Sequence, residues 1–347
     1  MSWKRLINPE HLEVMGLDIG SSAVKAVQLC KRDTGWTVTA AAVVDIARED
    51  ESDNGDKEMN TIKAVRNCLQ SSGIQTRLAV CSVCGPEVAV RCFRFPALPP
   101  EEIEGAILLE AEQVCPFNIG DSIVDYQLIS NGKDTVSGVL VAATNKLVGR
   151  KSDLVKQASL SEVLMDVDGL ALLNCLSEYE SLEAGPTMAV LNIGSSYTNL
   201  AIVSDNNLPF IRDMSYGGDD IINSVATKNG LSIEIVSEIL AGREDPSQDQ
   251  PELADSLKQA CRRLIIDVTD TLRYYTAEEK SVEKLFVCGG FALVKGFVEL
   301  LDSQLPTTAV LWNPFEKMAC EARQCEDMLC QNGPAMAVAA GLAMRSV

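Results

Sequence analysis

The chain has 347 residues, 46% of them hydrophobic, and its 30 Lys and Arg against 49 Asp and Glu give a formal charge of −19. The length and the hydrophobic fraction allow two domains, each with a core of its own. The negative charge argues against a nucleic-acid surface and against general attraction to anionic lipid, since both need clustered Lys and Arg. No apolar run approaches the roughly 18 residues of a membrane span, so we predict no transmembrane helix.

The twelve cysteines lie mostly within apolar stretches, which is typical of small buried residues in a reducing compartment. Cys81 and Cys84 form a C-x-x-C pair, but they lie in a predicted strand, where residues three apart face opposite sides. The chain has a single histidine, His11. The cysteine pattern therefore does not favour a metal or cluster site.

The first part of the chain reads as strands followed by a helix. Residues 14–29 are predicted to form a β-hairpin and residues 36–46 a further strand. A charged loop over 48–57 precedes a helix over 59–69, which Gly73 ends.

Residues 78–160 are predicted to form a compact β-β-α-β-β-α unit, inserted into a larger pattern. Pro99 and Pro100 followed by two glutamates mark a helix start. The buried face of that helix is expected at Ile103, Ile107 and Ala111. The other predicted elements are two strands over 78–95, strands over 123–129 and 135–143, and a helix over 145–160.

The second half repeats the strand-rich opening after a strand at 163–168 and a helix at 170–180. Three strands are predicted at 188–193, 197–203 and 208–214, and a buried strand at 285–288. A polar loop is predicted at 243–251, and helices at 217–228, 233–241, 252–279, 293–301 and 333–344.

A short motif appears twice and links the two halves. The stretch from Gly16 to Ser22 (GLDIGSS) returns from Val190 to Ser196 as VLNIGSS, and Asp18 and Asn192 stand 174 residues apart. In each copy an apolar run stops at a Gly-Ser-Ser turn and then resumes, as in a β-hairpin. Glycine permits the turn and lets backbone N–H groups approach an anion closely. We therefore predict two related α/β halves around a cleft, with the two turns as a clamp for a polyphosphate.

The residues around these turns have the chemistry of a nucleotide site. Asp18 could hold Mg²⁺ through water, because Mg²⁺ keeps much of its hydration. The glycine pair after the strand at 285–288 offers bare backbone to a ribose or purine. The candidate nucleotide-binding residues are Gly20, Ser21, Ser22 and Lys25 in the first half, and Asn192, Gly194, Ser195, Ser196, Thr198, Gly289 and Gly290 in the second.

The order of these three motifs resembles that of the actin-like ATPases: first phosphate loop, second phosphate loop, adenosine motif. The inserted unit is similar to that of the division protein FtsA. The stretches 94–103, 110–117, 125–126 and 337–345 resemble the PilM family of type IV pilus assembly, with the cytoplasmic domain of the secretion protein GspL as a close relative and an alternative. This resemblance implies an actin-like (ribonuclease H-like) duplicated fold that binds ATP and Mg²⁺.

The resemblance also implies subdomains and partners. The implied subdomains are 1A (14–77 and 161–186), the inserted 1C-like unit (78–160), 2A (187–214 and 282–347, with its last helix packing back on 1A) and 2B (215–281). A PilM-like protein is a cytoplasmic scaffold held at the inner membrane through partners. It docks the cytoplasmic N-terminal tail of a PilN-like protein in a groove involving the inserted unit. Other pilus or motor components, and self-association, stay open.

Two positions bear on hydrolysis. Second phosphate loops of the family usually begin with Asp, whereas this chain has Asn192, which lacks the charge that helps hold Mg²⁺ and orient an attacking water. Asp168 stands where related ATPases carry a residue that positions water, although a helix N-cap is an equally good interpretation. We therefore predict weak or absent hydrolysis. The alternatives are a docking pseudo-ATPase without nucleotide, an FtsA-like filament former, and a metabolic kinase, which the inserted unit argues against.

Overall fold

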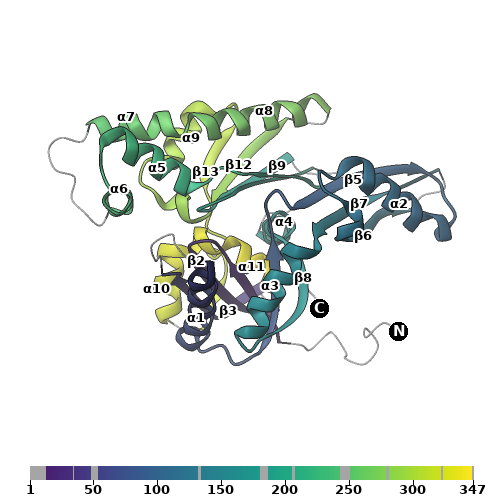
Figure 1. Cartoon of the computed structure of the whole chain (residues 1–347), viewed down its shortest axis with the longest axis horizontal. Helices are drawn as coiled ribbons and strands as arrows, with labels where there is room; N and C mark the ends of the chain where they lie inside the picture. Colours follow the sequence, from purple (N-terminus) through teal and green to yellow (C-terminus); the bar gives the residue numbers. More distant parts are fainter. Residues whose placement is uncertain are drawn as a thin grey trace. The chain divides into compact units, whose positions relative to one another are not determined.

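The computed structural model (Figure 1) describes residues 13–33, 35–47, 54–131, 134–179, 187–204, 208–242, 251–278, 281–321 and 323–345. His11 and most of the loops predicted at 48–57 and 243–251 lie outside these residues. The chain divides into two compact units, which we describe separately. The first takes its described residues from Met1–Val83, Lys146–Tyr179 and Asn313–Val347, and the second from Cys84–Asn145 and Glu180–Trp312. Among the described helices, none has the length and apolar character needed to cross a bilayer.

The first unit is built on a mixed sheet in the order β14-β3-β2-β1-β4-β8. Its strands are β1 (Met15–Ile19), β2 (Ala23–Arg32), β3 (Gly35–Asp45), β4 (Leu78–Val83), β8 (Ser161–Val167) and β14 (Ala319–Cys320). Its helices are α1 (Asn54–Ser72), α3 (Asn145–Gln157), α4 (Asp168–Tyr179), α10 (Arg323–Asn332) and α11 (Ala337–Ala343), with a 3-10 turn at Gly333–Met336. One buried cluster joins β1, β2, β4 and α1, and includes Met15, Leu17, Val65 and Cys81.

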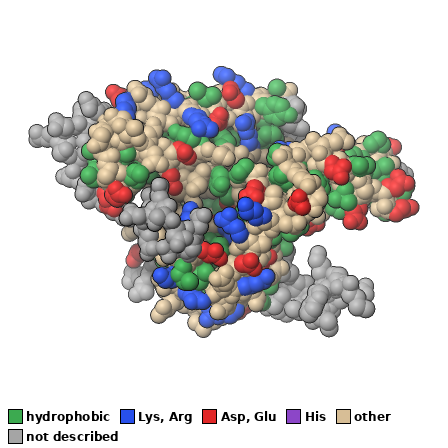
Figure 2. All heavy atoms as spheres, viewed as in Figure 1, with side chains coloured by type: hydrophobic (Ala, Val, Ile, Leu, Met, Phe, Trp, Pro, Cys, Tyr) green, Lys and Arg blue, Asp and Glu red, His purple; other side chains and the backbone are tan. Residues whose placement is uncertain are grey.

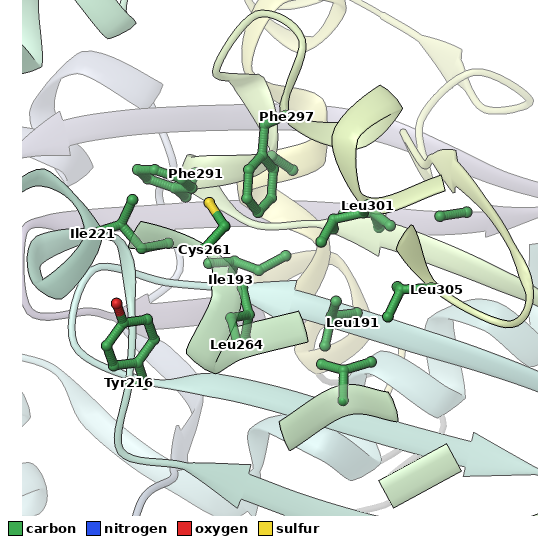
Figure 3. Packing of buried hydrophobic residues seen from close by; sticks show 14 of the residues in the cluster. Leu191, Ile193, Tyr216, Ile221, Cys261, Leu264, Phe291, Phe297, Leu301 and Leu305 are labelled. Carbon is green, nitrogen blue, oxygen red and sulfur yellow. The ribbon is translucent and has the colours of Figure 1, made fainter. Parts of the chain in front are cut away.

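The second unit is built on a sheet in the order β11-β10-β9-β12-β13. Its strands are β9 (Thr187–Ile193), β10 (Thr198–Val203), β11 (Phe210–Met214), β12 (Val282–Cys288) and β13 (Thr308–Leu311). Its helices are α5 (Gly218–Asn229), α6 (Ile233–Leu240), α7 (Pro251–Ala260), α8 (Arg262–Glu278) and α9 (Phe297–Gln304), with a 3-10 turn at Gly290–Leu293. Figure 3 shows side chains from β9, α5, α8 and α9 meeting in its core, where Leu191, Ile193 and Leu264 have no exposed surface.

The two sheets have the same connectivity. In each, the first three strands form an antiparallel meander, and the fourth strand then pairs in parallel with the first: β4 with β1, and β12 with β9. A fifth strand, β8 or β13, extends each sheet in parallel beyond the fourth. The duplication predicted from the repeated motif is therefore present in the strand order.

A smaller sheet, in the order β5-β7-β6, belongs to the second unit. It consists of β5 (Val88–Pro96), β6 (Ser122–Asn131) and β7 (Thr135–Thr144), with α2 (Pro100–Val114) on one face and a 3-10 turn at Ile119–Asp121. Ile103, Ile107 and Ala111 of α2 are buried against this sheet, as the sequence predicted. We call residues 84–145, which carry it, the inserted subdomain.

The inserted subdomain is smaller than the predicted unit over 78–160. β4 pairs with β1 and β8 in the large sheet of the first unit, and most of α3 also belongs to that unit. The apolar pattern located these elements correctly but could not assign their partners, because strand pairing depends on contacts distant in sequence.

Several predicted helices also have different bounds. The helix predicted at 252–279 is interrupted at Cys261 into α7 and α8, although apolar residues face the core on both sides of the break. The helices predicted at 293–301 and 333–344 each begin later, at Phe297 and Ala337, after a 3-10 turn, and α1 begins at Asn54 inside the predicted charged loop. The short strands β13 and β14 and helix α10 were not predicted.

The C-terminal segment packs onto the first sheet through glycines. A Cβ on Gly16 of β1 would overlap the carbonyl of Ala339 in α11, and a Cβ on Gly341 would overlap the carbonyl of Ala171 in α4. Beyond α11, Arg345 donates to both carboxylate oxygens of Asp166, with N···O distances of 2.5 and 2.9 Å. Residues 313–345 therefore complete the unit that the first residues begin.

We expect Gly341→Ala to lower the free energy of unfolding by about 1–3 kcal/mol, because the added methyl must displace helix backbone. Gly149→Ala is the matched control: Gly149 also lies in a helix of the first unit, but its Cβ would meet open space, so the change should stabilise by up to about 1 kcal/mol. Denaturant unfolding of both variants measures the difference. Equal stability of the two variants would contradict this packing.

Candidate functional site

The first Gly-Ser-Ser turn closes the hairpin between β1 and β2. The Gly20 N–H donates to the carbonyl of Ala23 at 3.0 Å. A Cβ on Gly20 would lie 3.0 Å from that carbonyl oxygen and 3.1 Å from Nζ of Lys25. The turn is therefore this tight only because residue 20 has no side chain. Ser21 is exposed and Ser22 is half-buried.

Asp18 of β1 and Lys25 of β2 are directly opposite each other in this antiparallel hairpin. Their ion pair measures 3.0 Å between Oδ2 and Nζ, and the two side chains are only 13% and 15% exposed. The lysine ammonium lies beside the turn, so the first loop joins a carboxylate, an ammonium and two hydroxyls.

A second lysine reaches the same hairpin from α3. Nζ of Lys151 donates to the carbonyl of Ile19, the last residue of β1, at 2.6 Å. Sequence reasoning missed this residue, because it lies among the other charged residues of a predicted surface helix.

Asp168 is the first residue of α4 and is 9% exposed. Its Oδ1 accepts a hydrogen bond of 2.6 Å from the buried hydroxyl of Ser82, at the end of β4. Since Leu17 pairs with Cys81, Ser82 stands level with Asp18 on the neighbouring strand. The structure therefore places Asp168 at the same edge of the first sheet as the first loop.

The second turn is held by the start of α5. The Gly194 N–H donates to the carbonyl of Tyr197 at 2.9 Å, and the carbonyls of Gly194 and Ser195 accept from the first two backbone N–H groups of α5, at 2.8 and 2.9 Å. A Cβ on Gly217, just before α5, would overlap the Ser195 carbonyl. Ser195 and Ser196 are half-buried within this turn.

Thr198 lies just beyond the second turn and has no exposed surface. Its hydroxyl donates to the carbonyl of Tyr216 at 2.7 Å. The hydroxyl proton of Thr198 therefore anchors the base of the hairpin and is not available to donate to a phosphate.

The two candidate adenosine-binding glycines follow β12. Gly289 has a φ of +95°, and a Cβ there would overlap the carbonyl of Ile193 and lie 2.6 Å from Oδ1 of Asn192. Gly290 is exposed, and a Cβ on it would meet nothing within 4 Å. The glycine pair thus packs against the second turn on one side and leaves its other side open.

Asn192 takes part in a hydrogen-bonded series that the sequence did not predict. Its Nδ2 donates to Oδ1 of Asn199 at 2.8 Å, and Nδ2 of Asn199 donates to Oδ1 of Asp213 at 2.8 Å. Oδ2 of Asp213 accepts from the backbone N–H of Gly85 at 2.6 Å. Burial raises the pKa of Asp213, and the two donated hydrogen bonds oppose that shift. The available signal was a polar residue, Asn199, in a strand that is apolar from Leu200 onward.

The structure therefore gathers the predicted residues into two groups. Asp18, the first turn, Lys25 and Asp168 lie in the first unit, and the second turn, Thr198 and the glycine pair lie in the second. A hollow of about 460 Å³ in the first unit lies elsewhere. Its walls include Arg66, Gly73 and Arg77, at the end of the sheet where β4 begins rather than at the end where β1 meets the first turn.

The chain matches the family described as "Type IV pilus assembly protein PilM" over residues 16–347. This match covers nearly the whole chain. The chain belongs to the PilM family. It is a type IV pilus assembly protein by this membership, and the prediction of the family is confirmed.

Solved structures agree with the family. A chain of the solved "PilM-PilN type IV pilus biogenesis complex" has a TM-score of 0.80 and 24% identity, over 97% of this chain and 99% of that one. The ethanolamine utilization protein EutJ from Carboxydothermus hydrogenoformans has a TM-score of 0.57 and 14% identity, over 99% and 93% of the two chains. A diol dehydratase-reactivating factor in nucleotide-free form has a TM-score of 0.56 and 10% identity, over 96% and 99%. These likenesses confirm the predicted actin-like ATPase fold.

We expect Ser82→Ala to destabilise the PilM-family chain by about 1–3 kcal/mol, because the buried carboxylate of Asp168 loses a donor. Ser177→Ala in α4 is the control, since that exposed hydroxyl bonds only a nearby helix carbonyl, and the change should stay within about 0.5 kcal/mol. Thermal unfolding of both variants is the measurement. A Ser82→Ala variant as stable as the Ser177→Ala variant would show that the Ser82–Asp168 contact contributes little.

Proposed function

We propose that this chain is an ATP-binding scaffold of the type IV pilus assembly complex. It binds ATP with Mg²⁺ through the two Gly-Ser-Ser turns and through Gly289 and Gly290, and it docks the cytoplasmic N-terminal tail of a PilN-like inner-membrane protein. The observation that carries the proposal is the family match over residues 16–347, combined with the two hairpin turns of identical connectivity.

The residues present fit a nucleotide. Both turns combine hydroxyls with a glycine at which a side chain would press on neighbouring atoms, as backbone close to phosphate requires. Lys25 supplies a positive charge beside the first turn, and the open side of Gly290 leaves room for a flat ring. Bound Mg²⁺ would neutralise phosphate charge, and Asp18 is the acid placed to hold its water ligands.

Weak hydrolysis follows from the second turn. Asn192 is uncharged, and its amide nitrogen is already engaged with Asn199. A neutral amide polarises water less than a carboxylate does, so orientation of an attacking water rests on Asp168 alone among the predicted residues. We propose that the role of this protein depends on nucleotide binding rather than on nucleotide hydrolysis.

The inserted subdomain exposes apolar side chains on α2 and on β6 to which a partner tail could bind. Figure 2 shows hydrophobic side chains beside acidic ones in the region that carries α2 and β6. Leu108 and Leu109 of α2 are 42% and 61% exposed, and Ile123, Tyr126 and Ile129 of β6 are exposed as well. The PilN partner in the solved PilM-PilN complex is a finding about that complex. A PilN-like partner for this chain, and its placement at the inner membrane through that partner, are our proposal.

A second candidate function is docking without nucleotide. The observation that favours it is the Asp18–Lys25 ion pair, which neutralises the one acid expected to serve Mg²⁺. In that case the fold would serve only to present the partner surface. A direct test of ATP binding decides between the two.

Mg-ATP at about one hundred times its dissociation constant should raise the free energy of unfolding by roughly 2.7 kcal/mol. Asp18→Ala should abolish this increase, and Asp45→Ala, an exposed acid at the end of β3, should keep it. Thermal unfolding with and without millimolar Mg-ATP is the measurement, with phosphate release followed in parallel. No increase in the unmodified protein would favour docking without nucleotide, and turnover of several per second that Asp18→Ala removes would contradict weak hydrolysis.

A synthetic peptide with the N-terminal cytoplasmic sequence of the cognate PilN-like protein should bind the full chain. Leu109→Glu should weaken that binding at least about tenfold, because an exposed apolar anchor becomes charged. Leu311→Glu is the matched control, since Leu311 of β13 is 50% exposed in the second unit but outside the inserted subdomain. Titration calorimetry measures both affinities. Equal affinities for the two variants would remove Leu109 from the docking surface, and no binding at all would overturn the proposed partner.

A further inference from the structure

We propose that Asp213 is a positioning residue: through Asn199 it fixes the orientation of the Asn192 amide in the second turn, and it ties that orientation to Gly85 at the root of the inserted subdomain. The effect of these hydrogen bonds on ATP binding rests on the proposed function, whereas the hydrogen bonds themselves do not depend on it. We call the series Asn192–Asn199–Asp213–Gly85 the amide relay. All four residues belong to the second unit.

The direction of the relay follows from hydrogen-bond chemistry. Both oxygens of Asp213 act as acceptors, one from Asn199 Nδ2 at 2.8 Å and one from the Gly85 N–H at 2.6 Å. Asn199 must therefore turn its amino group toward Asp213 and its carbonyl toward Asn192. Asn192 must then donate, and it does so at 2.8 Å. The acid on β11 thus sets the orientation of two amides on β10 and β9.

The end of the relay faces the glycine pair. Because its amino group is engaged, Asn192 presents Oδ1 on the other side, 2.6 Å from the position of a Cβ on Gly289. The Cys288 thiol approaches the same oxygen as a donor at 4.0 Å. An acceptor, rather than a donor, therefore lies against the backbone between the second turn and Gly289.

The relay accounts for Asn192 as the residue at this position. Asn199 is 1% exposed, so water cannot supply missing partners around it. An aspartate at 192 would place carboxylates on both sides of one amide, and only one of them could receive the amino group in its present orientation. The buried acid on β11 therefore requires a donor on β9.

The other end of the relay is the backbone of Gly85. This buried residue has a φ of +101°, and a Cβ on it would lie 3.1 Å from the ring of Tyr197, which follows the second turn. Its carbonyl accepts from Val88, the first residue of β5, at 3.0 Å. The second turn thus contacts the start of the inserted subdomain twice, through the relay and through the Tyr197 ring.

A double-mutant cycle tests the relay without any ligand. Asp213→Asn should be tolerated, because the new amide can accept from Gly85 and donate to Asn199 once both native asparagine amides turn over. Asn192→Asp should lower the unfolding midpoint by at least about 3 °C, and it should speed hydrogen exchange of the Gly85 amide about tenfold, since two carboxylates then share one donor. The double variant Asn192→Asp with Asp213→Asn should regain the unfolding midpoint and the slow exchange of the Gly85 amide. Its single carboxylate, at position 192, can accept from the amino group of Asn199 once that amide has turned over.

Asp270→Asn is the matched control, since that exposed acid of α8 pairs only loosely with Arg273, at 3.7 Å. Combined with Asn192→Asp, it should rescue nothing. Two results would overturn the relay: a double variant of Asn192→Asp with Asp213→Asn that loses as much stability as the two single variants together, or unchanged exchange of the Gly85 amide in Asn192→Asp. Both results are expected if Asp213 only stabilises the fold and does not orient Asn199.

Mg-ATP is added last. The unmodified protein should then protect the Gly85 amide further. Asp213→Asn should bind ATP without that protection, because its reversed series turns the amino group of Asn192, rather than Oδ1, toward Gly289. Equal ATP-dependent protection in Asp213→Asn would overturn the coupling between the second turn and the inserted subdomain. Absence of ATP binding in all variants would overturn the proposed function. The double-mutant cycle without ligand would then still test whether Asp213 orients Asn192.

Discussion

One hydrogen bond recurs at the two points on which this fold depends. In each half, the N–H of the turn glycine donates to the carbonyl three residues further on, from Gly20 to Ala23 at 3.0 Å and from Gly194 to Tyr197 at 2.9 Å. This bond closes a hairpin so tightly that a Cβ on either glycine would come within 3.0 Å of the carbonyl oxygen. Because the hairpins begin sheets that share the order of five strands, the bond sets where small polar residues gather at the edge of each sheet.

The two hairpins differ in the pair of residues that faces across them. Asp18 pairs with Lys25 in the first copy, and at the equivalent position Asn192 pairs with Asn199 in the second. The first copy thus contains a neutralised ion pair, and the second contains two amides whose orientation depends on Asp213. The acid missing from the second turn is present two strands away, at the contact with the inserted subdomain. This difference leaves a pair of opposite charges in the first copy, and connects the second copy to the inserted subdomain.

Local patterns were enough to predict the repeated turns, most strands and the buried face of α2, because these depend on residues close in sequence. They could not place β4, whose strand character is evident but whose partners β1 and β8 lie far along the chain. The same limit applies to the site. The turn residues were predicted from a motif. Lys151 of α3 and Ser82 of β4 instead contact the candidate residues of the first unit, and Asp213 of β11 contacts those of the second, all with ordinary local sequence. The close packing of Gly341 on Ala171 was equally invisible, since small residues are common on helices for other reasons.

A crystal structure of the full chain grown with Mg²⁺ and a non-hydrolysable ATP analogue would test whether the two turns serve one nucleotide, as we propose. We expect phosphate oxygens of a single analogue to contact the backbone or the hydroxyls of both Gly-Ser-Ser turns. We also expect the purine to lie against Gly290, and Asn192 still to donate to Asn199. An analogue bound at only one turn, or bound elsewhere with both turns unchanged, would contradict this proposal.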